Sequence, residues 1–262
     1  MSELMQFDDG EGYEAMMGVW SALVGKTFLD WLDIPPGARW ADIGCGNGAS
    51  TELIVSEAKP EAVEGLDPSE AQLAFARLRH RAGLANYKVG SALQLPYEDD
   101  VFDVAIMALV IFFVSEPARA VSELVRVVRP GGTVAAYAWD IEGGGFPYED
   151  VHAAMRGVGV EPLLPPRSEA AGLDVLEGLW SQAGLIDVET RELTATRVFS
   201  TFDDYWSVAT SAPGIAPVLA KLSTEQLDRV SNAVLGSRGE ADFAVRGRAH
   251  AVRGRLETGA VA

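Results

Sequence analysis

The sequence has little cysteine, little positive charge and no long apolar run, and each shortage excludes a class of protein. Cys45 is the only cysteine among 262 residues, so no intramolecular disulfide can form and the usage fits a reducing cytoplasm. Lysine and arginine number 21 against 38 acidic residues, and the formal net charge is −17. With no basic run long enough to follow a phosphate backbone, nucleic acid and anionic membrane surfaces are poor partners.

Signals for export, membrane insertion and metal binding are also missing. The N-terminal stretch MSELMQFDDGEGYE lacks the basic flank and apolar centre of a signal peptide. No apolar run approaches the roughly 18 residues that a membrane span needs. The three histidines are scattered without the spacing of metal ligands. We therefore expect a cytoplasmic protein, monomeric or homodimeric, that binds neither metal nor membrane.

Apolar periodicity predicts alternating strands and helices through the first half of the chain, after an amphipathic helical segment at 12–32. The expected strands lie at 39–44, 62–67, 86–90, 102–112 and 133–140, and the expected helices lie at 49–58, 69–82 and 117–128. The run at 102–112 is almost continuously apolar, which is typical of a strand buried on both faces. This alternation predicts a doubly wound α/β fold with a mostly parallel sheet covered by helices on both faces.

The second half of the chain is less regular. Residues 141–172 combine glycines, prolines and one short helix, a composition that predicts an insertion over one end of the sheet. A helix at 173–184, a strand at 185–199 and further helices at 202–236 follow. Residues 242–256 alternate apolar and basic side chains, as an edge strand with its arginines in water would.

No repeat or linker marks a second independent domain, so we expect a single domain over residues 1–262. Its expected parts are an N-terminal helical cap at 1–36, a cofactor-binding core at 37–140, and insertions at 141–172 and 200–240 that cover the substrate site.

A glycine-rich turn follows the first expected strand. The stretch WADIGCGNGAS, at 40–50, places glycines at 44, 46 and 48 before the next helix, where backbone can approach a ligand closely. The dinucleotide fingerprint spaces its glycines differently, as G-x-G-x-x-G. Asp42, two residues before the first glycine, would repel a pyrophosphate and attract an amino group or a sulfonium. The turn therefore predicts a ligand that is positively charged near it.

Four motifs in order make the sequence resemble the class I S-adenosylmethionine-dependent methyltransferases, in the small-molecule branch that includes the ubiquinone and menaquinone biosynthesis enzymes (methyltransferase type 11). The motifs are ADIGCGNG at 41–48, AVEGLDPSEAQL at 62–73, GSALQLPYEDDVFD at 90–103 and ELVRVVRPGG at 123–132. The resemblance covers residues 39–140. It implies a seven-stranded Rossmann-like sheet with an antiparallel last strand, S-adenosylmethionine as cofactor and S-adenosylhomocysteine as product.

The resemblance also implies which residues hold the cofactor. Asp42 and the glycine backbone would hold the methionine moiety, and Asp67 would accept hydrogen bonds from both ribose hydroxyls. Ser91 stands where an aspartate is common in the family, so its hydrogen bond to the adenine amino group would be weaker. The expected cofactor-binding residues are Asp42, Gly44, Cys45, Gly46, Asp67, Pro68, Gln72, Ser91, Ala92, Leu93, Ala108 and Leu109.

A substrate would bind beyond the carboxyl ends of the strands, and aromatic residues gather there and in the covering segments. They favour a small apolar or aromatic molecule, although ordinary core packing would also explain them. Phe113 stands where relatives often carry histidine, so no general base is identified and the catalytic residue is left unassigned. The expected substrate-binding residues are Tyr13, Met17, Trp20, Phe112, Phe113, Trp139, Asp140 and Phe146.

Methyl transfer by in-line displacement needs positioning more than a strong base, so the sequence favours this activity on a small molecule. Two alternatives stay open. A non-catalytic cofactor-binding protein would explain the missing base, and an NAD-dependent oxidoreductase would use a glycine turn, although of different spacing. Enzymes that methylate RNA bases through a catalytic cysteine are disfavoured, because the one cysteine lies in the cofactor turn.

Overall fold

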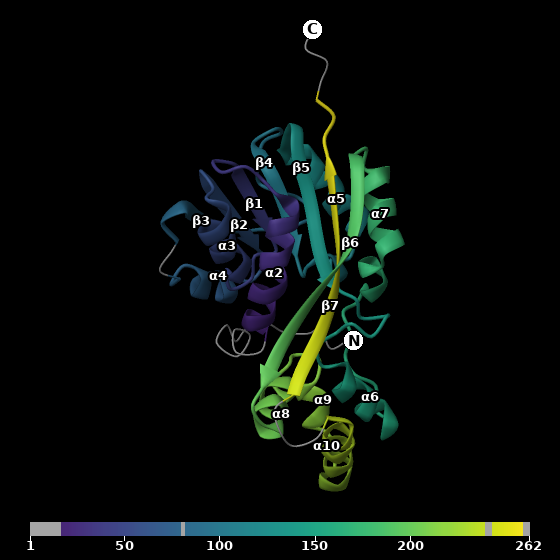
Figure 1. Ribbon diagram of the computed structural model, residues 1–262. Coiled ribbons are helices and arrows are strands. Elements are labelled where there is room, and N and C mark those ends of the chain that lie inside the picture. The colour runs from purple at the N-terminus through teal and green to yellow at the C-terminus, as the bar shows by residue number, and fades with distance from the viewer. Residues whose placement is uncertain (1–16, 80–81, 239–242, 259–262) are drawn as a thin grey trace.

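The computed structural model describes residues 17–79, 82–238 and 243–258, which build a seven-stranded mixed sheet (Figure 1). The strands are β1 (Arg39–Ile43), β2 (Ala62–Asp67), β3 (Ala85–Val89), β4 (Phe102–Ala108), β5 (Val128–Trp139), β6 (Ile186–Phe199) and β7 (Phe243–Arg255). Their order is β3-β2-β1-β4-β5-β7-β6. The first five run parallel, and β7 is antiparallel to both of its neighbours. The predicted fold class is confirmed.

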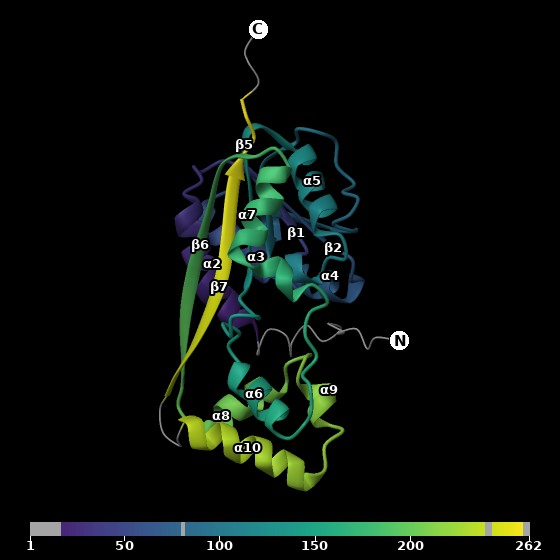
Figure 2. The same ribbon diagram turned by 90° about the vertical axis from the view of Figure 1, so that its right-hand side faces the viewer.

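Helices cover both faces of the sheet (Figure 2). The α-helices of the described residues are α2 (Val19–Leu32), α3 (Ala49–Leu53), α4 (Glu70–Ala76), α5 (Pro117–Val127), α6 (Glu149–Gly157), α7 (Leu173–Gln182), α8 (Phe202–Thr210), α9 (Ala216–Leu219) and α10 (Thr224–Arg238), of which α6, α8, α9 and α10 lie beyond the end of β5. Helices α2 and α3 pack together on one face, and α5 and α7 pack together on the other. Within the described ranges, no helix is both long enough and apolar enough to cross a membrane.

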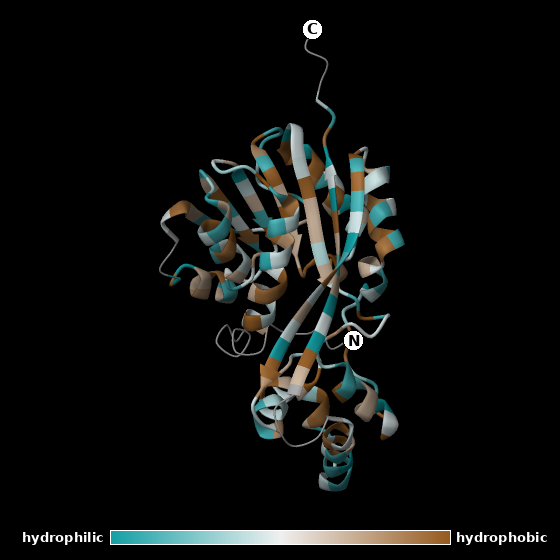
Figure 3. Cartoon of the chain, in the orientation of Figure 1, coloured by the Kyte–Doolittle hydropathy of each residue, from teal (hydrophilic) through white to brown (hydrophobic). Residues whose placement is uncertain are grey.

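The middle of the sheet is the core of the molecule. Residues 40–43 of β1 and 104–107 of β4 are each at most 1% exposed, because helices shield both of their faces. Helix α5 contributes an apolar stripe, with Ala120, Val121 and Leu124 fully buried, and turns its polar residues outward. Figure 3 shows the contrast between the hydrophobic central strands and the mixed surface helices. A rigid sheet therefore fixes the positions of the strand ends.

Strands β6 and β7 continue past the end of β5. Trp139, the last residue of β5, pairs with Ala249, and residues 243–248 pair with β6 beyond that point. The extended hairpin reaches a group of helices, α6, α8, α9 and α10, at the end of the sheet where β5 finishes (Figures 1 and 2). These four helices come from residues 149–157 and 202–238.

The prediction that residues 242–256 form an edge strand was wrong. Strand β7 lies between β5 and β6, and β6 is at the edge. Two of the arginines of β7, Arg248 and Arg253, contact neighbouring side chains and carbonyls. The guanidinium of Arg253 lies 4.8 Å from the ring centroid of Trp31 and donates to the Trp31 carbonyl at 2.7 Å. Alternating basic residues fit an inner strand when aromatic and acidic partners cover them.

Two predicted boundaries also differ from the structure. The fourth strand ends at Ala108, four residues early, because Leu109 adopts a left-handed backbone with φ +62° and residues 111–113 form a short 3₁₀ helix. The helix expected at 69–82 ends at Ala76. Its predicted cap is confirmed, since Ser69 Oγ accepts a hydrogen bond from Gln72 N at 3.3 Å.

Candidate active site

The loop between β1 and α3 turns sharply through its three glycines. Gly44, Gly46 and Gly48 have φ values of +78°, +53° and +82°. A Cβ on Gly44 would lie 2.5 Å from a methyl of Val110, and one on Gly48 would lie 2.9 Å from the Ala76 Cβ. A Cβ on Gly46 would meet nothing within 4 Å. The first and third glycines therefore permit close packing, whereas the second faces open space in which a ligand fits.

Asp67, at the end of β2, faces the same loop. Its Oδ2 accepts a hydrogen bond from Gly46 N at 2.9 Å, and its Oδ1 accepts one from Ser69 N at 2.8 Å. Burial raises the pKa of Asp67, and these two backbone hydrogen bonds oppose that effect. Each carboxylate oxygen keeps a further lone pair for a ligand hydroxyl. The side chain is thus held in position to receive a diol.

Asp42 is fully buried beneath the loop. Its Oδ2 accepts hydrogen bonds from Ser50 Oγ at 2.5 Å and from Thr51 Oγ1 at 2.6 Å. In the part of the chain that the structure describes, its Oδ1 has no hydrogen-bond partner. Burial raises the pKa of Asp42 to about 6, against the effect of the two hydroxyls. A buried carboxylate oxygen without a partner fits a ligand that brings a cationic donor.

The other residues expected to bind a cofactor surround this loop. Cys45 is buried, and burial raises the pKa of its thiol well above the usual value, so it stays protonated and unreactive. Gln72 is buried in the first turns of α4, immediately after Pro68 and the Ser69 cap. Ala108 and Leu109 lie at the end of β4. The ends of β1, β2 and β4 are therefore brought together, as the motif order implies.

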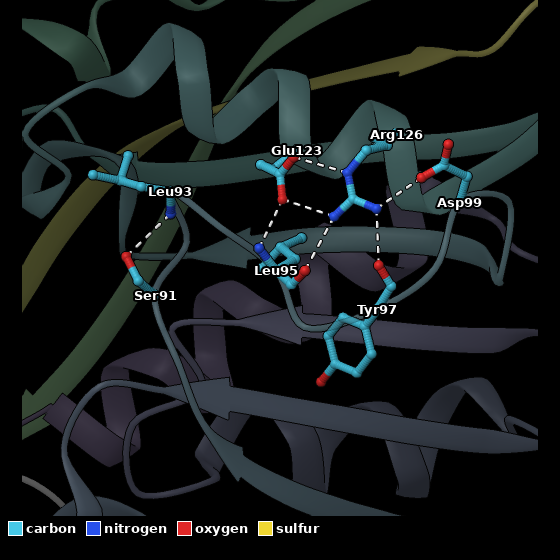
Figure 4. Close-up of polar contacts among 7 residues, drawn as sticks. All are labelled: Ser91, Leu93, Leu95, Tyr97, Asp99, Glu123 and Arg126. Atoms are coloured by element: carbon cyan, nitrogen blue, oxygen red, sulfur yellow. Dashed lines mark hydrogen bonds and ion pairs between the residues drawn. The ribbon is translucent and has the colours of Figure 1, made fainter.

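Ser91 begins a loop that helix α5 anchors (Figure 4). Its Oγ accepts a hydrogen bond from Leu93 N at 3.2 Å, so the serine stabilises the turn. Further along, Glu123 Oε2 accepts from Leu95 N at 2.7 Å, and Arg126 donates to the carbonyls of Leu95 and Tyr97 at 3.1 and 2.8 Å. The loop that would contact an adenine is thus held in place by two side chains of α5, the acidic Glu123 and the basic Arg126.

Replacing Arg126 with alanine is expected to lower the free energy of unfolding by about 1–2 kcal/mol, because charged hydrogen bonds to two carbonyls and to Glu123 are lost from a partly exposed site. Urea denaturation measures the change. Arg119→Ala removes an exposed arginine of the same helix whose nearest acid, Glu116, is 3.7 Å away. This control should change stability by less than about 0.5 kcal/mol. Equal effects of the two variants would contradict an anchoring role for Arg126.

An apolar cavity lies at the ends of β4 and β5. Its volume is about 70 Å³. Leu109 lines it, and the next residue, Val110, packs against Gly44. The lining residues are Met17, Leu109, Phe112, Phe113, Trp139, Ile141, Phe146, His152, Leu163, Pro165, Ala212, Pro213, Gly214 and Ile215. The cavity therefore joins the ends of β4 and β5 to the two covering insertions.

The cavity collects five of the eight residues that the sequence assigned to a substrate, namely Met17, Phe112, Phe113, Trp139 and Phe146. Tyr13 lies outside the described residues. Trp20 is fully buried and donates from Nε1 to the hydroxyl of Tyr148 at 3.0 Å, away from the lining. Its position fixes the first helix against the segment that covers the cavity.

Asp140 is also not among the lining residues. Its Oδ2 accepts from Arg248 Nε at 2.9 Å, and its Oδ1 accepts from Gly143 N at 2.9 Å. These contacts hold the turn after β5 against β7, so Asp140 stabilises a turn.

His152 is the lining residue that sequence reasoning missed. It is 3% exposed and lies on α6, one turn after Glu149, whose Oε2 is 3.3 Å from its Nδ1. The i, i+3 spacing of an acid and a histidine was visible in the sequence. Nothing local showed that this helix would reach the ends of β4 and β5. The remaining cavity residues, from 163–165 and 212–215, carry no signal of their own.

Sequence comparison matches the central part of the chain to known proteins. Residues 41–136 match a family model described as a methyltransferase domain. A demethylmenaquinone methyltransferase of Symbiobacterium thermophilum is 34% identical over 131 residues, which cover 47% of this chain and 52% of that protein. The chain spans about half the length of the curated relatives it matches. The matched part is 44% of an uncharacterized protein of Mycobacterium tuberculosis and 52% of the Symbiobacterium enzyme.

Solved structures share the fold along most of the chain. The phosphoethanolamine N-methyltransferase 2 of Haemonchus contortus, in complex with phosphomonomethylethanolamine and S-adenosylhomocysteine, gives a TM-score of 0.60 at 17% identity and covers 98% of this chain and 59% of that one. The [4+2]-cyclase SpnF gives 0.54 at 19% identity, over 91% and 82%. At these identities the likeness concerns the fold alone, and the cyclase shows that the fold serves more than one chemistry.

Proposed function

We infer that this chain, whose residues 41–136 are a methyltransferase domain of the class I S-adenosylmethionine-dependent type, transfers a methyl group from S-adenosylmethionine to a small apolar molecule. One observation carries the inference. A glycine loop has Asp42 beneath it and Asp67 beside it, and its Gly44 packs against Val110, the residue after Leu109 of an apolar cavity at the carboxyl ends of β4 and β5. This arrangement supplies one site for a cationic cofactor and one for its acceptor.

The residues fit the cofactor in chemistry as well as in motif. Asp42 has an acceptor oxygen without a partner, which suits the amino group of the methionine moiety. Asp67 offers a fixed carboxylate for the ribose diol. The open side of Gly46 leaves room between them. A pyrophosphate would instead place negative charge near two carboxylates, which disfavours a nicotinamide cofactor.

The chain's own task in the reaction is positioning. The bound cofactor supplies an activated methyl group on its sulfonium. The cavity walls hold the acceptor and exclude water, and the rings of Phe112 and Phe113, whose centroids are 4.7 Å apart, present aromatic faces suited to a cation or a flat molecule. Residues from 141–165 and 212–215 line the cavity on this side and would cover the acceptor.

A label-transfer experiment tests the proposed activity. The chain is incubated with methyl-labelled S-adenosylmethionine and a small-molecule extract of the organism that encodes it. We expect label to appear in an organic-phase product, and Asp67→Ala to reduce its formation. Label that stays in a water-soluble product would contradict the apolar acceptor. No transfer at all, with S-adenosylmethionine still bound, would support the non-catalytic alternative.

Cofactor affinity is expected to weaken in acid. Burial raises the pKa of Asp42 to about 6, and a cationic ligand favours the ionised carboxylate. The affinity for the cofactor is therefore highest above that pH and falls as the pH drops through it. The dissociation constant for S-adenosylhomocysteine should rise about tenfold between pH 7 and pH 5. Calorimetric titration measures it, and Asp42→Asn should bind with little pH dependence. An equally steep profile in the variant would show that another group is responsible.

A further inference from the structure

Among the described residues, a histidine that lines the apolar cavity has one ring nitrogen without a hydrogen-bond partner. His152, on α6, lines the cavity and is 3% exposed. Its Nδ1 lies 3.3 Å from Glu149 Oε2, whereas its Nε2 is buried and unpaired. Leaving a buried polar atom without a partner is unfavourable. A molecule in the cavity that brought a donor to Nε2 would recover this cost.

The neighbours of His152 determine which of its nitrogens carries the proton. Glu149 also pairs with Arg156. Burial of Glu149 acts to raise its pKa, but the hydrogen bond from His152 and the contact with Arg156 outweigh it and hold the pKa below its usual value. An ionised carboxylate can only accept, so Nδ1 is the nitrogen that donates to it, and Nε2 is the nitrogen left to accept a proton from a ligand.

The ring is also held in place and near the predicted cofactor site. Phe146 stacks on His152, with ring centroids 5.0 Å apart and planes 20° from parallel. Leu109 and Trp139, at the ends of β4 and β5, line the same cavity. The Nε1 of Trp139 is likewise buried without a partner, counting the described residues alone. Two residues that line the cavity thus each have a buried ring nitrogen without a partner.

We propose that His152 is the general base of the reaction and that the acceptor is a flat, apolar molecule with a hydroxyl group. This assignment rests on the proposed function. A hydroxyl would donate to His152 Nε2, and an oxygen of the same molecule would accept from Trp139. An apolar cavity with a proton acceptor suits a phenol or enol better than an amine, which reacts through its own lone pair.

The proposed step transfers the methyl group from the sulfonium sulfur to the hydroxyl oxygen. The hydroxyl oxygen forms a bond to the methyl carbon as the bond between that carbon and the sulfonium sulfur breaks. The sulfur keeps the electron pair and becomes a neutral thioether. The hydroxyl proton passes to His152 Nε2, and the resulting imidazolium is stabilised by Glu149 until the proton leaves to water. The products are a methyl ether and S-adenosylhomocysteine.

Binding of two matched probes tests the assignment without turnover. Equilibrium dialysis of the chain saturated with S-adenosylhomocysteine compares 2-naphthol with naphthalene, which lacks the hydroxyl. We expect the native chain to bind 2-naphthol at least tenfold more tightly. His152→Phe keeps an aromatic ring of similar size and should bind the two within about twofold of each other. His250→Gln changes a buried histidine that contacts the Ala171 carbonyl outside the cavity, and should keep the native preference.

A second variant separates proton transfer from binding. His152→Gln retains an amide oxygen that can accept a hydrogen bond but cannot take a proton. It should keep most of the preference for 2-naphthol while slowing single-turnover formation of 2-methoxynaphthalene by about a hundredfold. Thermal melting of each variant checks that it is folded.

Several outcomes overturn the proposal. They are equal affinity of the native chain for the two probes, failure to bind 2-naphthol, retention of the preference in His152→Phe, and an unchanged turnover rate in His152→Gln. The dialysis is repeated without S-adenosylhomocysteine, and cofactor binding is measured separately. A failure of the cofactor to bind contradicts the proposed function, whereas loss of the hydroxyl preference contradicts the role of His152.

Discussion

Replacing Gly44 with alanine is expected to destabilise the chain by about 2–5 kcal/mol, whereas the same change at Gly46 is expected to cost about 1 kcal/mol. Both residues have positive φ, so in both variants the strain of a left-handed alanine lowers the free energy of unfolding by about 1–2 kcal/mol. At Gly44 the new Cβ would also lie 2.5 Å from a Val110 methyl, and overpacking adds about 1–3 kcal/mol. At Gly46 the Cβ meets nothing within 4 Å.

The two variants should therefore separate folding from ligand binding. Gly46→Ala should fold, yet weaken S-adenosylhomocysteine binding at least tenfold, because its methyl group projects into the space assigned to the cofactor. Gly37→Ala is the matched control, since Gly37 also has positive φ, at +86°, with nothing within 4 Å, but lies before β1. It should lose similar stability and keep full affinity. Urea denaturation and calorimetric titration give the two quantities.

If Gly46→Ala bound the ligand as well as Gly37→Ala does, the space above the loop would not be the cofactor site. If Gly44→Ala were as stable as Gly46→Ala, Val110 would have room to move away, and the turn would not need its first glycine for packing.

Removal of the Asp67 carboxylate is expected to weaken cofactor binding about 10- to 150-fold, which corresponds to about 1.5–3 kcal/mol for hydrogen bonds to a charged group. The carboxylate accepts from Gly46 N and Ser69 N, so Asp67→Ala also loosens the loop that it orders. Asp67→Asn keeps one acceptor oxygen and should show a smaller loss. Calorimetric titration with S-adenosylhomocysteine measures each dissociation constant.

Asp103 provides the control for this experiment. Its Oδ2 accepts a hydrogen bond from Arg39 N at 2.7 Å, and it pairs with Arg129, but it lies near the start of β4 rather than at its end. Asp103→Ala therefore removes a carboxylate that also holds backbone, at the opposite end of the same sheet. It should lower stability without changing cofactor affinity. Equal loss of affinity in both variants would mean that Asp67 acts only through the stability of the fold.

The parts of the fold that the sequence predicted are those decided locally. The strands that begin at Arg39 and Ala62 match their predicted starts, because a buried parallel strand needs a continuous apolar run and a helix cap needs a residue such as Ser69. The glycine loop was predictable for the same reason. The spacing of its glycines and the negative charge of Asp42 together restrict the class of ligand that the loop can bind.

The parts that the sequence did not predict depend on distant neighbours. Alternating apolar and basic residues show which face of β7 is apolar but not which strands lie beside it, so its inner position was missed. The early end of β4 depends on the left-handed turn at Leu109, which brings Val110 against Gly44. His152 and Glu149 are adjacent on one helix face, yet only the fold brings that face to the cavity.

We infer that the glycine loop binds a sulfonium cofactor rather than a dinucleotide. Parallel calorimetric titrations of the native chain with S-adenosylmethionine, S-adenosylhomocysteine and NADH test it most directly. The arrangement of Asp42, Gly46 and Asp67 predicts micromolar binding of the first two and no binding of NADH. Binding of NADH without binding of S-adenosylmethionine would contradict the account and favour an oxidoreductase.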